Sequence, residues 1–412
     1  MMHQEITYSC TTCGQVFSAA DVRYLCPVCA GNNDPLQPPL GVLKVIYPYA
    51  ELKSQGVSFK QLKEREFLDL LPIANIENLP PLKIGNTPLY RVRSIRNETI
   101  PFELYLKDDS QNPTYSFKDR ASALVSAFAK EHEIDTIVTA STGNAGSSLA
   151  GICASQGQKA YVIVPESAPI AKLTQIIMYG ATLIPVKGTY DDAFDLSVSA
   201  TREMGWYNRN TAYNPMTIEG KKSVSFELFE ELGKMVPDAV FVPVGDGVNI
   251  SGVYKGFEDL LKTGIIDHMP MVVAVQAEGS ANLVNNLEGV GFTIRPSRTL
   301  ADSISVDIPR NFHMARQFLD LYNGEWLTVS DNEILNASAL LAKSHGLFVE
   351  PAAAAAMAGL LKYHEQELVS PGSKNVVLLT GSGLKDLSAV KPLLNMPKAI
   401  EPTLSELKYL LK

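Results

Sequence analysis

Short apolar runs alternate with stretches of helical periodicity through most of the chain. Runs of about four to eight apolar, β-branched residues predict buried strands, and apolar residues at a spacing of three to four predict helices. The expected strands are 136–140, 159–165, 181–186, 238–245, 271–279 and 375–383, and helices are expected at 147–157 and 170–180. Strands that alternate with helices are typical of parallel α/β sheets.

The expected strands fall into two groups, at about 135–210 and about 235–385. This grouping predicts two α/β domains with a cleft between them, the smaller one inserted in the larger within a region 86–400. An Ala-rich segment from Glu350 to Tyr363 carries Leu and Met at helical spacing and predicts a packed helix. Two further regions precede this body: a Cys-rich unit at 1–35, and an extension at 36–85 with a strand-like segment 42–47 and a helical segment 58–71.

Composition narrows the class of protein. The chain has 412 residues, 46% of them hydrophobic and 19% charged, which is typical of a globular protein. Its net charge of -8 argues against a nucleic-acid-binding protein. No apolar run approaches the ~20 residues that span a bilayer. The segment 1–10 lacks the features of a secretory signal, so we expect a cytoplasmic location.

Four of the five cysteines form two Cys-x-x-Cys pairs near the N-terminus, and Gly14 and Gly31 follow the pairs at positions that suit tight turns. Two such pairs make a closed tetrahedral site with four thiolate ligands, which predicts a structural rather than a catalytic zinc ion. Disulfides and chance clustering are the alternatives, and a reducing compartment weakens the first. The expected ligands are Cys10, Cys13, Cys26 and Cys29.

The segment 108–122 contains the first candidate for chemistry. Lys118 stands at the start of an expected helix, after Asn112 and Pro113. The positive end of a helix dipole lowers the pKa of a lysine, and a lysine with a lowered pKa is a better nucleophile toward carbonyl groups. The alternative is a solvated surface run of Lys118, Asp119 and Arg120.

Three glycine-rich segments each join an expected strand to a helix, at 140–146, 242–252 and 378–386. Small residues allow the backbone to approach a ligand, and free N–H groups at a helix start bind anions such as carboxylate or phosphate. Asn144 can hydrogen-bond a phenolic oxygen, and Thr380 can hydrogen-bond a ring nitrogen. Each segment alone is also compatible with an ordinary turn, but their order after the lysine favours one ligand site.

Four motifs carry a family resemblance: NPTYSFKDR, STGNAG, VGDGVN and LTGSGLKD. They resemble those of the fold-type-II, tryptophan synthase β-like enzymes that use pyridoxal 5'-phosphate (PLP), and most closely the threonine synthases, over about residues 85–390. Some threonine synthases, and the similar cysteate synthases, carry a zinc-ribbon-like N-terminal extension. The resemblance implies a homodimeric lyase of threonine biosynthesis that converts O-phosphohomoserine and water to threonine and phosphate.

The resemblance also implies roles for residues that match the motifs. Lys118 would form the Schiff base with PLP and move protons at substrate carbons, and Phe117 would pack beside the cofactor. Asn144 would bind the 3'-oxygen of PLP, and Thr380 would face its ring nitrogen. The PLP phosphate would be held by Gly245, Asp246, Gly247, Val248 and Asn249, and the substrate carboxylate by Ser141, Thr142, Asn144 and Ala145.

The chain departs from the family pattern at several positions. Tyr115 replaces a small residue, and Ser382 replaces His. Within 210–223, Thr217 replaces an Arg that helps to bind the substrate's phosphate, and Lys221 replaces Gln. Loss of a bidentate donor weakens phosphate binding by a few kcal/mol, and either Lys221 or its neighbour Lys222 is expected to supply a point charge instead.

These departures keep two other hypotheses open. One is a related replacement or elimination enzyme that acts on another amino acid, in the manner of a cysteate synthase, a dehydratase or an ammonia-lyase. The other is a non-catalytic protein in which the zinc ribbon binds a partner. Activity with O-phosphohomoserine distinguishes a threonine synthase from a related enzyme that acts on another amino acid. Turnover of any amino acid excludes the non-catalytic protein.

Overall fold

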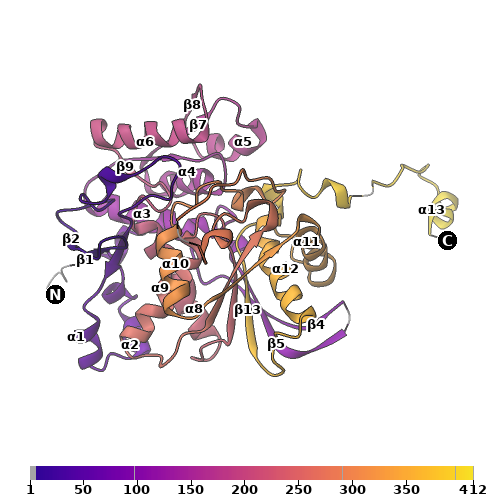
Figure 1. Cartoon of the computed structure of the whole chain (residues 1–412). Coiled ribbons are helices and arrows are strands. Elements are labelled where there is room, and N and C mark those ends of the chain that lie inside the picture. Colours follow the sequence, from indigo (N-terminus) through magenta and orange to yellow (C-terminus); the bar gives the residue numbers. More distant parts are fainter. Residues whose placement is uncertain (1–5, 97, 290, 395, 412) are drawn as a thin grey trace.

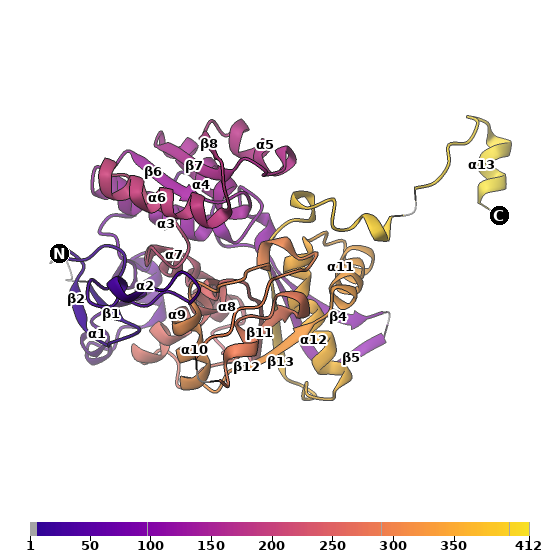
Figure 2. The same ribbon diagram turned by 45° about the horizontal axis from the view of Figure 1, so that its top comes forward.

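The computed structural model describes residues 6–96, 98–289, 291–394 and 396–411. The segment 1–10, in which no secretory signal is expected, lies partly outside these residues. The described strands form three sheets, one of three strands near the N-terminus and two larger ones of four and six strands. Figures 1 and 2 show the four-stranded sheet with its helices above the six-stranded sheet.

The four-stranded sheet is entirely parallel, in the order β8-β7-β6-β9. Its strands confirm the predictions at 136–140, 159–165 and 181–186, and α4 and α5 confirm the helices between them. The strands are β6 (Thr136–Ala140), β7 (Lys159–Pro165), β8 (Thr182–Val186) and β9 (Tyr207–Asn208), and the helices are α4 (Asn144–Gln156), α5 (Ile170–Met178) and α6 (Tyr190–Met204).

The six-stranded sheet has the order β12-β11-β10-β13-β5-β4, and only the edge strand β4 is antiparallel to its neighbour. Three of its central strands confirm the predictions at 238–245, 271–279 and 375–383. The strands are β4 (Leu89–Ile95), β5 (Glu98–Asp108), β10 (Ala239–Pro243), β11 (Met271–Ala277), β12 (Glu325–Val329) and β13 (Lys374–Leu379).

Helices bury both faces of this sheet, as a parallel sheet requires. Along β10, Val240 and Val242 belong to the apolar cluster on one face, whereas Phe241 belongs to the cluster under α12 on the other. The predicted Ala-rich helix is confirmed as α12. The helices around the sheet are α3 (Lys118–Glu131), α7 (Met216–Lys221), α8 (Ser223–Glu231), α9 (Val248–Lys262), α10 (Phe312–Leu321), α11 (Asp331–His345) and α12 (Pro351–Glu365).

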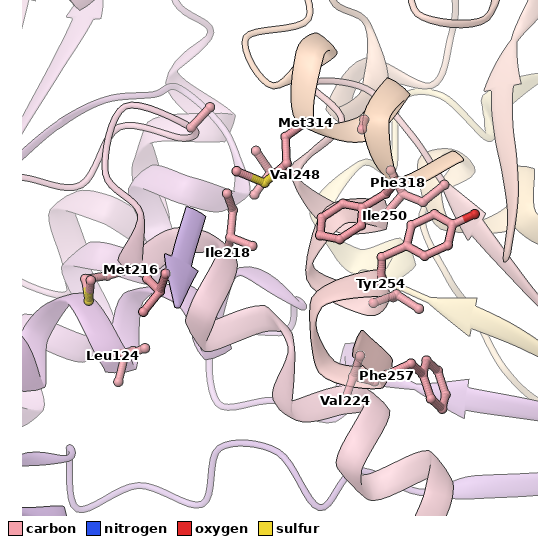
Figure 3. Close-up of a cluster of buried hydrophobic side chains, with 14 of the residues drawn as sticks. Leu124, Met216, Ile218, Val224, Val248, Ile250, Tyr254, Phe257, Met314 and Phe318 are labelled. Atoms are coloured by element: carbon pink, nitrogen blue, oxygen red, sulfur yellow. The ribbon is translucent and has the colours of Figure 1, made fainter. Parts of the chain in front are cut away.

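The larger apolar cluster joins α7, α9 and α10 (Figure 3). The rings of Tyr254 and Phe318 stack with centroids 5.4 Å apart, and both side chains are buried. Ile218 of α7 and Val248 of α9 lie in the same cluster. This packing fixes α7 against the first turn of α9, which is the part of the fold that the site uses.

The N-terminal sheet has the order β2-β1-β3, with antiparallel pairing throughout. Its strands are β1 (Thr7–Cys10), β2 (Val16–Ser18) and β3 (Leu43–Ile46). The hydroxyl of Tyr24 accepts a 3.0 Å hydrogen bond from the backbone N–H of Asn208 in β9, and its ring stacks on Tyr213 at 4.6 Å. The Cys-rich unit is therefore packed against the four-stranded sheet.

A buried polar network joins the N-terminal extension to α7 and α9. Tyr47 donates a 2.6 Å hydrogen bond to Glu219, and Tyr49 donates one of 2.6 Å to Asp259. Lys222 pairs with both carboxylates, at 2.5 Å and 2.7 Å, and Lys255 also pairs with Asp259. Because these charges are buried, removing any one of them would leave an uncompensated charge and destabilise the folded protein.

The helix expected over 58–71 is shorter than predicted. α2 covers Phe59–Glu64, and a 3₁₀ turn follows at Leu68–Leu70. Glu66 and Phe67 take positive φ angles of 55° and 57°, which end the helix. The reason is tertiary, because the reversal brings Phe67 onto the ring of Phe226 at 4.9 Å.

The chain ends in an extended segment that carries α13 (Leu404–Leu410) away from the body (Figures 1 and 2). Every described residue from 396 onward is exposed. No helix among the described residues is both long enough and apolar enough to cross a membrane.

Candidate active site

Lys118 is the first residue of α3, and the loop before it is attached to the end of β13. Phe117 donates its backbone N–H to the carbonyl of Thr380 at 2.9 Å, and Ser382 donates its own to the carbonyl of Tyr115 at 3.1 Å. Phe117 and Thr380 are buried. These contacts bring the lysine motif and the third glycine segment together beyond the ends of the parallel strands β5 and β13.

Tyr115, the first departure from the family pattern, has a φ angle of 68° and is half-exposed. A left-handed conformation is unusual for a bulky residue, and the loop holds it there through the backbone contact to Ser382. Ser382 uses its hydroxyl to accept a 3.3 Å hydrogen bond from the backbone N–H of Leu384. Tyr115 therefore lies in the loop before Lys118, and Ser382 lies in the segment after β13 that contacts this loop.

Burial and charged neighbours together set the pKa of Lys118. Desolvation is the main cause that lowers its pKa below the usual lysine value, and the positive charge of Arg209 acts in the same direction. Glu350 and Asp246 partly offset this because their negative charges favour the ammonium form. A lysine with a lowered pKa has more of the neutral, nucleophilic amine at physiological pH.

The segment 140–146 carries the chain from β6 into α4. Ser141 accepts a 3.2 Å hydrogen bond from the N–H of Gly143 through its hydroxyl. A Cβ at Gly146 would overlap the carbonyl oxygen of Ser141, so the loop needs glycine there. Ser141, Thr142 and Ala145 are partly exposed beside the first N–H groups of α4. This arrangement suits a carboxylate ligand.

Asn144 is buried, and its side-chain amide donates hydrogen bonds to Glu350. Its Nδ2 lies 3.0 Å from both carboxylate oxygens of Glu350 and 3.3 Å from the hydroxyl of Ser303. Glu350 is also held by its backbone N–H, which donates to the carbonyl of Gly381 at 3.0 Å. Burial raises the pKa of its carboxyl group.

Glu350 was not among the residues predicted for the site. In the sequence it begins an Ala-rich helix, where an acidic residue favours the helix dipole. Its position beside the site depends on the neighbouring glycine, because a Cβ at Gly381 would lie 2.5 Å from Oε1 of Glu350. The pairing of a glycine with an acid more than thirty residues earlier cannot be read from local pattern.

The segment 242–252 forms a glycine turn at the start of α9. Gly247 has a φ angle of 86° and directly precedes the helix, and a Cβ at Gly245 would lie 2.9 Å from Cα of Ile304. Val248 and Asn249, the first two residues of α9, are buried. The free N–H groups of this first turn form a position for a phosphate.

The carboxylate of Asp246 has the same sign of charge as a phosphate bound in this turn, so its contacts matter. Its carboxylate accepts a 3.3 Å hydrogen bond from the backbone N–H of Arg310, and its carbonyl accepts one of 2.9 Å from Asn311. Burial raises the pKa of Asp246, while Arg310, Lys221 and Lys118 lower it. The acid is therefore held by a neighbouring loop and by nearby cations.

The segment 210–223 contains Lys221 and Lys222, which were both candidates to supply a positive charge to the substrate's phosphate. The structure distinguishes the two. Lys222 is bound in the buried network with Glu219 and Asp259. Lys221 is also fully buried, but its Nζ has no hydrogen-bond partner within the described part of the chain. Thr217 donates its hydroxyl to the carbonyl of Asn214 at 2.8 Å. Of the two lysines, only Lys221 is available to a ligand.

The site residues fit PLP on the observations above. An amine with a lowered pKa stands at Lys118, an amide-lined turn stands at 245–249, and a buried hydroxyl residue stands at Thr380. Ser116, two residues before the lysine, has a buried hydroxyl oxygen without a hydrogen-bond partner among the described residues. An unsatisfied polar atom in this place is consistent with a polar ligand.

The four N-terminal cysteines converge as predicted. Their sulfur atoms all lie within 4.8 Å of one another, with 3.9 Å from Cys10 to Cys29 and from Cys13 to Cys26. Zn–S bonds of about 2.3 Å in a tetrahedron need sulfurs about 3.8 Å apart, so the cluster can bind a metal ion. At these separations the four sulfur atoms are not joined in disulfides in this structure.

The turns around the cysteines are only partly as expected. Gly14 has a φ angle of 73°, whereas Gly31 lies in a 3₁₀ turn without a positive φ. The second tight turn uses Gly41, with a φ angle of 83° and its Cα packed against Cys26. Gly14 and Gly31 therefore both lie in turns beside the Cys pairs, and Gly41 supplies a further turn that the sequence did not indicate.

Comparisons with known proteins agree with this geometry. A family described as pyridoxal-phosphate dependent enzymes matches residues 81–381. A threonine synthase of Methanocaldococcus jannaschii is 36% identical, with 98% of each chain covered, and one of Halalkalibacterium halodurans is 35% identical over 82% of this chain and 93% of its own. The solved serine racemase of Dictyostelium discoideum superposes with a TM-score of 0.63 at 25% identity, covering 79% of this chain and 98% of that one.

Proposed function

Because the chain belongs to the family of pyridoxal-phosphate-dependent enzymes and, within it, to the threonine synthases, we propose that it converts O-phosphohomoserine and water to threonine and phosphate. The observation that carries the proposal is the arrangement around Lys118. Its amine, the anion-binding starts of α4 and α9, and the buried Lys221 belong to one site.

We assign the cofactor contacts as follows. Lys118 holds PLP covalently, Phe117 packs beside it, and Thr380 faces its ring nitrogen. Asn144 faces its 3'-oxygen and is oriented by Glu350. The first turn of α9 with its preceding loop, from Gly245 to Asn249, holds the cofactor's phosphate.

The substrate is bound through its two ends. The N–H groups at the start of α4, with Ser141, Thr142, Asn144 and Ala145, hold the carboxylate. Lys221 offers a positive charge to the phosphate at the other end. Holding both ends fixes the substrate carbons near Nζ of Lys118, which reduces the entropy to be lost in the reaction.

When bound, PLP withdraws electrons from the substrate's α-carbon and so acidifies its protons. Lys118 then removes and returns protons at the substrate carbons, because desolvation keeps part of its amine neutral. In the net reaction the bond from Cγ to the phosphate oxygen breaks, and phosphate leaves with the electron pair. One Cβ–H bond breaks, the oxygen of water bonds to Cβ, and a proton is added at Cγ. The remaining proton of that water goes to the released phosphate.

The proposal is tested by incubating the holoenzyme with O-phosphohomoserine and measuring phosphate and threonine. Equal amounts of both products are expected. Release of phosphate with 2-oxobutanoate instead of threonine would indicate an elimination enzyme, and no release from this substrate would refute the proposal. Homoserine without its phosphate is the matched control, and no turnover is expected with it.

We further propose that the four-cysteine cluster holds structural zinc and that the protein is a cytoplasmic homodimer. The cysteines are all free thiols, which matches a reducing compartment. The exposed apolar side chains of α13, among them Leu404, Leu407 and Leu410, offer a surface to a second copy. We also propose units at 1–35, 36–85 and 86–400, the last with an inserted unit at about 135–210.

A further inference from the structure

Two buried cations beside Lys118 carry donors that the protein itself leaves unused. Arg209 and Lys221 are both fully buried. Nη2 of Arg209 and Nζ of Lys221 have no hydrogen-bond partner among the residues that the structure describes. A buried cationic donor without a partner is strongly unfavourable, so two of them close together indicate a place for an anion.

The remaining contacts of Arg209 place it next to the reactive lysine. Its Nε donates to the hydroxyl of Ser122 at 3.2 Å, and its Nη1 donates to the hydroxyl of Thr211 at 3.2 Å. Ser122 is four residues after Lys118 in α3, and therefore on the same face of that helix. The two hydroxyls hold the guanidinium in place while Nη2 stays free for a ligand.

Lys221 lies between the two helices whose first turns form the site. A Cβ at Gly220 would overlap the backbone of Arg120 in α3, and a Cβ at Gly252 in α9 would lie 2.7 Å from Cβ of Lys221. α7 is thus pressed between α3 and α9, and Lys221 is its last residue. Burial, Lys118 and Arg209 lower the pKa of Lys221, whereas Asp246 raises it.

Helix geometry relates Lys221 to the missing family arginine. Thr217 stands where threonine synthases carry that arginine, and residues four apart lie on the same face of a helix. A basic side chain is therefore retained on this face of α7 but moved by one turn. Lys222 cannot serve in this way, because it points into the network with Glu219 and Asp259.

We propose that Arg209 and Lys221 together bind the phosphate of the substrate, a phosphate monoester dianion, in place of the arginine that Thr217 replaces. The inference rests on the proposed function and names its specificity-determining residues. The cofactor's phosphate has its own position, because the first turn of α9 supplies free N–H groups to it. Arg209 supplies a directional donor and Lys221 a point charge.

Kinetics of holoenzyme variants test the pair. In Lys221→Met and Arg209→Met, we expect KM for O-phosphohomoserine to rise by at least about tenfold, because each removes a charge-assisted contact. Lys221→Arg should stay within about threefold of the parent, since the charge is kept. Lys83→Met, which removes an exposed lysine, is the control and should change nothing. Melting curves identify variants that fail to fold.

A second substitution tests whether an arginine at position 217 can replace Lys221 in binding the substrate's phosphate. Thr217→Arg in the Lys221→Met background returns the arginine to the same helix face one turn earlier, and we expect it to recover at least part of the lost affinity. An unchanged KM in both single-methionine variants would refute the inference, while continued threonine formation would leave the proposed function intact. If the variants instead weaken PLP binding, measured by absorbance, with KM unchanged, the pair binds the cofactor's phosphate and the inference is wrong.

Proton uptake on phosphate binding is a further test, because it would not occur if Lys221 had only a structural role. At about pH 8.5 inorganic phosphate is a dianion, and its negative charge should raise the pKa of Lys221 and increase the fraction of its ammonium form. Calorimetry of wild-type holoenzyme in two buffers of different ionisation enthalpy should show uptake of protons on phosphate binding. Lys221→Arg should bind phosphate without that uptake. Phosphate binding unaffected by Lys221→Met would overturn the inference even if O-phosphohomoserine is not a substrate.

Discussion

Each carboxylate oxygen of Glu350, at the start of α12, lies 3.0 Å from the side-chain nitrogen of Asn144, at the start of α4. The contact joins the Ala-rich helix under the six-stranded sheet to the first helix of the four-stranded sheet. The same carboxylate raises the pKa of Lys118, against the effect of desolvation. Glu350 therefore acts on both the cofactor's amide contact and the reactive amine.

Replacing Glu350 with Gln should lower the pKa of Lys118 further, because the substitution removes the main negative charge that favours its ammonium form. The rate at which the apoprotein captures PLP depends on the neutral amine, so its pH midpoint should move to lower pH. Glu401→Gln changes an exposed acid and serves as the control. A midpoint that stays in place or rises would contradict the assigned electrostatics.

Lys118→Ala should abolish the visible absorbance band of covalently held PLP and lower turnover by about 10³-fold or more, since the proton-transferring group is lost. The spectrum and the rate of threonine formation are both measured. Lys130→Ala, at the exposed end of the same helix, should retain both properties. A full absorbance band in the Lys118 variant would show that another residue holds the cofactor.

The four-cysteine cluster should contain about one zinc ion per chain after purification under reducing conditions. Cys26→Ser should lower this content and reduce the melting temperature, because the metal holds two turns together. Cys153→Ala changes the cysteine outside the cluster and should leave the zinc content unchanged. Metal analysis of the wild-type protein that finds no zinc would exclude the assignment.

A buried lysine and an exposed lysine should respond differently to the same substitution. Lys222→Met removes one cation from the buried network with Glu219 and Asp259 and leaves their negative charge undercompensated, and we expect the free energy of unfolding to fall by about 3–5 kcal/mol. Lys60→Met, on an exposed ion pair, should change it by less than about 1 kcal/mol. Chemical denaturation measures both values. Equal stability of the two variants would show that the buried network contributes little.

The sequence predicted those parts of the fold and site that depend on local pattern. Strands such as β6 and β10, the helix α12 and the convergence of the four cysteines were all predicted, because periodicity and spacing are visible in a few residues. Lys118 was also visible, since a lysine at a helix start has a physical signature of its own.

What the sequence missed depends on contacts between distant segments. Arg209 follows the two-residue strand β9, and its role comes from Ser122 and Lys221 on two other elements. Glu350 depends on Gly381 and Asn144 in the same way. The early end of α2 also has a tertiary cause, in the packing of Phe67 on Phe226. The signal for Arg209 was a buried guanidinium nitrogen, Nη2, without a hydrogen-bond partner among the described residues, and only the three-dimensional structure reveals it.

The N-terminal sheet joins segments on both sides of the proline-rich stretch that ends at Pro39. β3 (Leu43–Ile46) pairs with β1 (Thr7–Cys10), and the backbone N–H of Cys26 donates to the carbonyl of Gly41. A chain shortened to begin after Cys29 would keep β3 but lose its neighbour β1. The exposed backbone of such an edge strand invites pairing with other chains. Aggregation, more than loss of metal, would then limit the shortened enzyme.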